Sequence, residues 1–135
     1  MPAVRAAAEK LDRRLDEMCR AYGHSVVNEF PPAPYLDQKL HRSTTAAAVN
    51  VAHIPAFTAE LSTGLAPNSA VVSAAVVGLR NVFRWAGMLG GEAEPVSGIA
   101  VVDPGFACRR RYAPRVNQPG IIRHYLEAGD PVSKG

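Results

Sequence analysis

The stretch His53-Ile-Pro-Ala-Phe-Thr-Ala-Glu-Leu61 has the composition of a short β-strand buried on both faces. Side chains alternate across a strand, so Ile54 and Glu60 share one face while Phe57 lies on the other. Burying a carboxylate is costly unless it is paired or coordinated, and open α/β sheets bind ligands at the carboxyl ends of their strands. Glu60 is therefore a candidate general base, whose pKa burial would raise. The alternative is a glutamate at a strand end that reaches solvent or a neighbouring arginine.

An amphipathic helix is predicted over residues 2–22, because apolar side chains recur there at three- and four-residue steps between charged ones. Gly23 follows the last apolar residue of the pattern, where a left-handed helix cap is expected. The β-branched stretch 25–30 then favours a short strand. It ends at Pro31-Pro-Ala-Pro34, because proline cannot donate a hydrogen bond to a sheet.

Two further helices are predicted around the quoted stretch. Ser43 is a candidate N-cap for residues 44–50, and Asn68 or Ser69 is one for a long helix that ends at Gly90-Gly91. The expected buried face of the long helix consists of Val72, Ala75, Val76, Leu79, Val82, Phe83 and Ala86. The order helix, strand, helix, strand, helix favours crossover units on a parallel sheet, and hence an α/β fold.

The amino-acid composition changes near Glu94, where we place a domain boundary. Beyond it, Gly or Pro recurs every few residues. Two short apolar pieces, 99–102 and 121–125, favour a small all-β section there. The chain starts on a helix with no strand before it and closes on Val132-Ser-Lys-Gly135, a turn signal with no strand after it. Because two strands make a poor parallel sheet, we expect the chain to be part of something larger.

The composition is that of one globular domain of 135 residues, with 47% hydrophobic and 20% charged residues. The longest apolar stretch, 70–79, is well short of the roughly 20 residues that span a bilayer, and Arg5 and Glu9 interrupt any signal peptide. We therefore predict a soluble cytoplasmic protein with no membrane partner. Cys19 and Cys108 lie far apart in the sequence, so neither a thiolate zinc site nor a disulfide framework is predicted.

Positive charge is concentrated near the C-terminal end, where residues 109–135 carry six basic and two acidic side chains. Arg109-Arg-Arg111, with Tyr112 and Arg115, has the chemistry to clamp a carboxylate, because guanidinium groups match carboxylates in geometry and charge. A solvated basic edge is the simpler alternative. Nucleic-acid binding would need more basic residues and more interleaved aromatic side chains, so no nucleic-acid partner is predicted.

Several segments together resemble the succinylglutamate desuccinylase/aspartoacylase family, which consists of zinc-dependent deacylases related to the metallocarboxypeptidases. The first two are Ile54-Pro-Ala-Phe-Thr-Ala-Glu-Leu61 with Gly64, and Val77-Gly-Leu-Arg-Asn-Val-Phe-Arg-Trp-Ala-Gly-Met-Leu89. The end of the chain, Gly120-Ile-Ile and Glu127-Ala-Gly-Asp-Pro-Val-Ser-Lys-Gly135, is similar to the start of that family's C-terminal β-subdomain.

The resemblance implies a partial three-layer α/β/α zinc-peptidase-like domain, with residues 1–94 as its C-terminal part. Residues 95–135 would then be the start of a small, truncated β-subdomain. The implied reaction is hydrolysis of an N-acyl amino acid or a similar small amide. Glu60 would be the general base that activates a zinc-bound water.

The basic cluster has two functional interpretations. Under the resemblance, Arg111, Tyr112 and Arg115 are candidate substrate-binding residues, since the family places a tyrosine of its β-subdomain at the substrate. The alternative is a non-enzymatic α/β module that binds an anionic partner through Arg109–Arg115.

The family's zinc ligands have no counterpart in this sequence. They come from a His-x-x-Glu motif and a later His upstream of the catalytic glutamate, whereas none of His24, His41 and His53 has a glutamate three residues on. His124-Tyr-Leu-Glu127 has the spacing, but it is expected in a strand, where a separation of three puts the side chains on opposite faces. We therefore expect this chain alone to bind no zinc and to be inactive, with the ligands supplied from upstream or by another chain.

Overall fold

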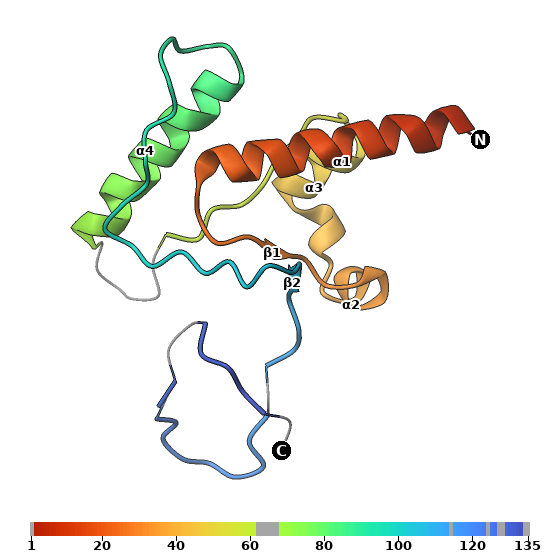
Figure 1. Ribbon diagram of the computed structural model, residues 1–135. Coiled ribbons are helices and arrows are strands. Elements are labelled where there is room, and N and C mark those ends of the chain that lie inside the picture. The colour runs from red at the N-terminus through yellow and green to blue at the C-terminus, as the bar shows by residue number, and fades with distance from the viewer. Residues whose placement is uncertain (1, 62–67, 114, 124, 127–128, 134–135) are drawn as a thin grey trace.

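The computed structural model describes residues 2–61, 68–113, 115–123, 125–126 and 129–133, and helices dominate it (Figure 1). In chain order the elements are α1 (Pro2–Tyr22), β1 (Val27–Asn28), α2 (Pro32–Asp37), the 3-10 helix η1 (Leu40–Arg42), α3 (Thr44–Asn50), α4 (Ser69–Trp85) and β2 (Cys108–Arg109). β1 and β2 form a small parallel sheet, in which Val27 lies opposite Cys108 and Asn28 opposite Arg109. At this coarse level the fold agrees with the predicted α/β class.

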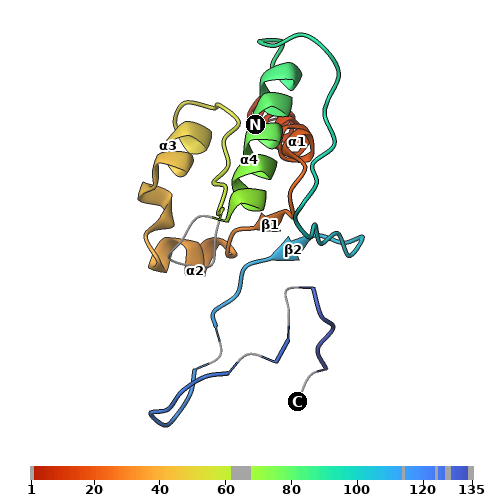
Figure 2. The ribbon, with the colours of Figure 1, turned by 90° about the vertical axis from the view of Figure 1, so that its left-hand side faces the viewer.

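The core of the molecule lies where α4 packs against α1 (Figures 1 and 2). Met18 and Tyr22 of α1 and Ala74 of α4 are buried there. Gly78 lets the two helices approach closely, because a Cβ at this position would lie 2.6 Å from the backbone oxygen of Tyr22. Phe57 joins this contact from the segment after α3, with its ring centroid 5.0 Å from that of Tyr22.

A polar clamp on α4 holds the chain that follows the helix. The buried side-chain amide of Asn81 donates to the backbone oxygen of Glu94 at 2.8 Å and accepts from the Glu94 N–H at 2.8 Å. The Glu94 carboxylate pairs with Arg84 at 2.6 Å and with Arg80 at 3.0 Å. The two Asn81 hydrogen bonds and the Arg84 ion pair hold residue 94 against α4, although the buried Arg84 Nε has no hydrogen-bond partner. The domain division placed near this residue stays a prediction.

The predicted starts of α3 and α4 are confirmed by their caps. The Ser43 hydroxyl accepts from the Ala46 N–H at 3.1 Å, and the Asn68 side chain accepts from the Ala70 N–H at 2.9 Å. Gly23 adopts the left-handed conformation expected after α1, with φ of +78°. None of the helices in the described ranges combines the length and the apolar character that a membrane span requires.

The predicted end of α4 at Gly90 is wrong, because the helix stops at Trp85. Gly87 takes a left-handed φ of +73°, and its N–H bonds to the Arg84 carbonyl at 2.9 Å. The Met88 N–H reaches the Phe83 carbonyl at 2.8 Å. These two bonds form a Schellman motif, which terminates the helix one turn before the glycine pair.

The strand predicted over residues 53–61 is also wrong, since this segment has no regular secondary structure. Pro55 cannot donate to a ladder, and the only sheet among the described residues lies elsewhere, at β1 and β2. The Ile54 N–H instead bonds to the carbonyl of Ala48 in α3 at 2.9 Å. The expected burial on both faces is absent as well, because Ile54 and Glu60 are exposed.

The remaining predicted strands are shorter than expected or missing from the described residues. The strand over 25–30 is reduced to Val27–Asn28, and residues 99–102 contain none. Residues 121–123 and 125 form no strand either, and Ile121 is 93% exposed. Short apolar pieces need neighbouring strands to pair with, and the described chain offers them no such neighbours.

The chain exposes far more surface than a folded protein of its size. Its accessible surface is 11334 Å² for a mass of 14.4 kDa. A folded monomer of that mass exposes about 6,800 Å². The chain by itself therefore leaves more surface exposed than a folded monomer of this mass does.

Candidate functional site

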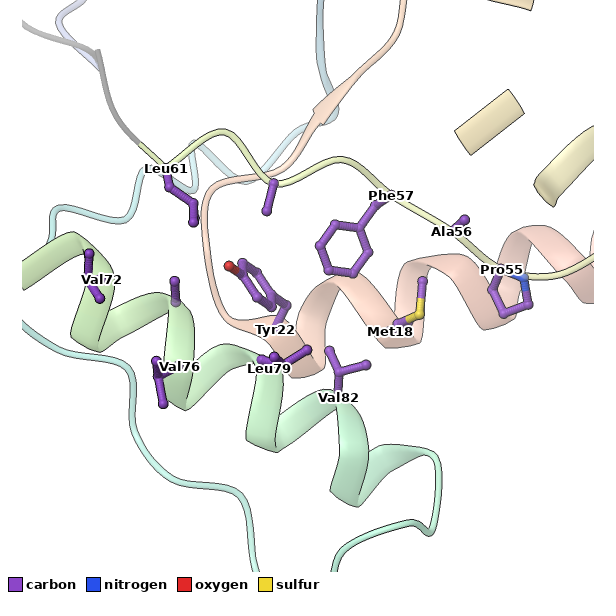
Figure 3. A pocket seen from close by; sticks show the side chains of 12 residues that line it. Met18, Tyr22, Pro55, Ala56, Phe57, Leu61, Val72, Val76, Leu79 and Val82 are labelled. Carbon is purple, nitrogen blue, oxygen red and sulfur yellow. The ribbon is translucent and has the colours of Figure 1, made fainter. Parts of the chain in front are cut away.

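An apolar groove lies between α1, α4 and the segment 55–61 (Figure 3). The groove has a volume of about 560 Å³, and every side chain that lines it is apolar except for the Tyr22 phenol. Its residues are Met18, Tyr22, Pro55, Ala56, Phe57, Ala59, Leu61, Val72, Ala75, Val76, Leu79 and Val82. Burial raises the pKa of the Tyr22 hydroxyl. A surface of this kind offers contact area and no chemistry.

The groove overturns the prediction of a buried apolar face on α4. Val72, Val76 and Leu79 belong to the predicted face, yet they are 47–53% exposed along the groove. The buried positions of α4 are Ala74, Gly78 and Asn81, which are small or polar. The apolar periodicity therefore describes a face that needs a partner, and no described part of the chain covers it.

The second hollow, which we name the basic pocket, lies beside the sheet. It has a volume of about 370 Å³ and combines three arginines with aromatic and proline side chains: Phe30, Pro31, Pro34, Arg109, Arg110, Arg111 and Tyr112. The β1–β2 pairing builds it, because it places residues 109–112 beside the chain leading into α2. The Arg110 N–H bonds to the Asn28 carbonyl at 2.8 Å and continues that pairing beyond β2.

The three arginines of the basic pocket are not equivalent. Arg110 forms ion pairs with Glu29 at 3.1 Å and with Glu60 at 3.6 Å, so two carboxylates balance its charge. Arg109 donates to the backbone oxygen of Glu29 at 3.2 Å. Arg111 has no hydrogen-bond or ion-pair partner within the described ranges. Arg111 is therefore the least engaged of the three guanidinium groups, and Arg109 also has no carboxylate partner.

Aromatic rings form the other wall of the basic pocket. The Phe30 and Tyr112 ring centroids are 5.1 Å apart, with an interplanar angle of 34°. The Arg110 guanidinium carbon lies 5.7 Å from the Phe30 ring centroid. Tyr112 is 54% exposed, which leaves part of its ring open to a ligand. The pocket thus joins an available cation to an apolar platform.

Glu60, the predicted general base, stands between the two hollows. Its neighbours Ala59 and Leu61 line the groove, whereas its own carboxylate faces Arg110 of the basic pocket. The side chain is 76% exposed, so the burial on which the sequence prediction depended is absent. The alternative weighed for this residue, a glutamate that reaches solvent and a neighbouring arginine, describes its geometry.

Of the predicted substrate-binding residues, the structure brings Arg111 and Tyr112 into one pocket. Arg115 is exposed and is not part of its lining. Sequence reasoning misses Phe30, Pro31 and Pro34, because the prolines indicate only the end of a strand. The signal for them is an aromatic residue followed by prolines in a polar surface region.

The residues that the structure describes do not form a zinc site. No cluster of three or more His, Cys, Asp or Glu side chains occurs among them. His124 and Glu127, the one pair with metal-ligand spacing in sequence, lie outside the described residues, as do Ser62 and Gly64. The ligand chemistry that the family resemblance implies therefore does not fit the described part of this chain.

Comparison with protein-family models, with curated proteins and with solved structures gives no match to the chain. The family resemblance accordingly depends on the residues and motifs quoted for it, and the function on the groove and the basic pocket.

Proposed function

We propose that this chain contributes the general base and the substrate-carboxylate site of a zinc-dependent deacylase that hydrolyses an N-acyl amino acid or a similar small amide. The single observation that carries this proposal is the 3.6 Å contact between Glu60 and Arg110. It joins the predicted base to the pocket of Arg111 and Tyr112, residues about fifty positions away in sequence.

The chemistry follows from this juxtaposition. Arg111 pairs with the substrate carboxylate and fixes the amide beside Glu60. The Glu60 carboxylate takes a proton from the attacking water and passes it to the leaving amine. Arg110 holds Glu60 in place and keeps it oriented towards the pocket.

The proposal takes the zinc ligands from polypeptide outside this chain, as the family resemblance implies, and the described residues contain no cluster of metal-ligating side chains. The apolar groove supports this part of the proposal, because it is an interface without a partner. Val72, Val76 and Leu79 are 47–53% exposed along the groove, and no described part of the chain covers them. Completion by an additional polypeptide would cover the groove and bring metal ligands to the rim where Glu60 stands.

The test is amide hydrolysis by the protein joined to the polypeptide encoded directly upstream of Met1. That upstream reading frame is expected to contain a His-x-x-Glu motif and a later His. Glu60→Gln should lower kcat about 10²- to 10⁴-fold, the usual contribution of a general base. Glu92→Gln, at an exposed glutamate away from both hollows, is the matched control and should leave kcat unchanged. Full activity of the Glu60→Gln enzyme would refute the assignment.

A second candidate function is favoured by Arg111, which has no partner in the described part of the chain. The basic pocket would then bind an anionic partner without catalysis, through the Arg109–Arg115 segment. This candidate predicts salt-sensitive binding that Arg111→Gln weakens and that Glu60→Ala leaves unchanged. Loss of hydrolysis in the Glu60 variant separates the two functions.

A further inference from the structure

The basic pocket has room and charge for one small anion. Its volume of about 370 Å³ is near the lower end for small-molecule sites, so it suits a metabolite and not a macromolecular surface. Arg110 is balanced by Glu29 and Glu60, and Arg109 is engaged by the Glu29 backbone. Arg111 is the one guanidinium of the pocket without any partner among the described residues, and Arg109 has no carboxylate beside it.

The rest of the lining is mainly apolar. Phe30, Pro31, Pro34 and Tyr112 make up four of the seven lining residues. The Phe30 and Tyr112 rings are tilted by 34° to each other, Tyr112 is partly exposed, and the proline rings add apolar surface. A second carboxylate placed against these side chains would lose its hydration, a loss that only Arg109 of the lining could offset in part. An aromatic ring would gain a stacking contact there.

We propose that the basic pocket selects small monocarboxylates bearing an aromatic or similarly flat apolar group, with the carboxylate on Arg111 and the ring against Tyr112 and Phe30. As a statement about the substrate this rests on the proposed function: the deacylase would prefer N-acylated aromatic amino acids to N-acylated Asp or Glu. The binding itself requires neither zinc nor catalysis.

Equilibrium binding to the chain, measured by calorimetry or by ligand-observed NMR, tests the proposal with three probes. N-acetyl-phenylalanine carries both the ring and the carboxylate, its C-terminal amide lacks the carboxylate, and N-acetyl-aspartate lacks the ring. N-acetyl-phenylalanine should bind about tenfold or more tightly than either of the others, since each lost contact is worth about one decade of affinity. Equal affinity for N-acetyl-aspartate, or no binding of N-acetyl-phenylalanine, would overturn the proposal.

Variants locate the site. Arg111→Gln should weaken N-acetyl-phenylalanine binding about tenfold, while Arg13→Gln, at an exposed arginine of α1, should not change it. Tyr112→Phe keeps the ring and should bind as wild type, whereas Tyr112→Ala should lose about five- to tenfold. Unchanged affinity in Arg111→Gln or in Tyr112→Ala would place the ligand elsewhere and refute the pocket.

The outcomes distinguish this inference from the proposed function. If the chain joined to the upstream polypeptide binds aromatic carboxylates selectively but hydrolyses none of the amides, the specificity proposed for the basic pocket stands and the deacylase function is refuted. Hydrolysis that depends on Glu60 but shows no preference for aromatic substrates would uphold the deacylase and reject the pocket's specificity.

Discussion

The two sides of α4 differ in side-chain size and in burial. The buried side is made of Ala74, Gly78 and Asn81, with Gly78 against Tyr22 of α1 and Asn81 bonded to the Glu94 backbone. The side that lines the groove carries Val72, Val76 and Leu79, and it is half exposed. The helix therefore packs within this chain through its small residues and leaves its larger apolar ones uncovered.

This contrast separates two requirements of a helix contact. Close approach needs small side chains, and Gly78 supplies it by letting α4 reach the backbone of Tyr22. Apolar burial needs a partner surface, and the described chain provides none for the groove side. The difference shows that the α1–α4 contact is made within this chain, while the groove side has no covering partner among the described residues.

The largest effect on stability is expected from breaking the close contact. Gly78→Leu places a side chain where even a Cβ would lie 2.6 Å from the Tyr22 oxygen. Overpacking of this kind should lower the free energy of unfolding by about 3 kcal/mol, measured by urea denaturation. Ser73→Leu, at an exposed position of the same helix, is the control and should be neutral or slightly stabilising. Equal stability of the two variants would mean that the helices do not meet at Gly78.

The next effect concerns the polar clamp on the buried side. Asn81→Ala removes both hydrogen bonds to the Glu94 backbone and leaves those groups without partners. The free energy of unfolding should fall by about 2 kcal/mol. Arg80→Ala removes only an exposed ion pair to the same residue and should cost less than about 0.5 kcal/mol. A larger loss in Arg80→Ala than in Asn81→Ala would assign the clamp to charge instead of to buried hydrogen bonds.

The α1–α4 contact should also make stability depend on alkaline pH. Burial raises the pKa of Tyr22, and burial followed by the nearby Asp16 raises the pKa of the Cys19 thiol. Both groups then lose their protons in the unfolded chain before the folded one, so stability should fall as pH rises through about 8.5 to 10. Urea unfolding measured across this range tests the sign. Tyr22→Phe should reduce the slope, and a rise in stability with pH would contradict the burial of both groups.

The sequence predicts local features of the fold well, but it does not predict contacts between segments that are far apart in the chain. Caps depend on neighbouring residues, so Ser43 and Asn68 can be assigned from the sequence alone. The apolar stripe on α4 is also evident from its spacing, but spacing alone does not tell whether it is buried, and Val72, Val76 and Leu79 are exposed. The Glu60–Arg110 contact joins residues far apart in the chain, and no local pattern encodes it. The predicted strand over 53–61 fails because strand propensity means little without a neighbouring strand.

The smallest effect is expected on the groove side. Val76→Asn replaces a residue that is already 53% exposed, so the free energy of unfolding of the chain alone should change by no more than about 0.5 kcal/mol. A loss above about 1 kcal/mol would show that the groove is covered within the chain itself. The same variant should weaken association with the completing polypeptide, which a pull-down with that polypeptide measures.

The most direct test of the central claim, that this chain holds the base of a hydrolytic site whose metal ligands lie elsewhere, is zinc stoichiometry. Purified chain and completed protein are dialysed against the same zinc buffer, and metal is measured by atomic absorption. The chain alone should retain no stoichiometric zinc, and the completed protein should retain one ion per chain. One zinc ion per chain in the isolated polypeptide would contradict the claim.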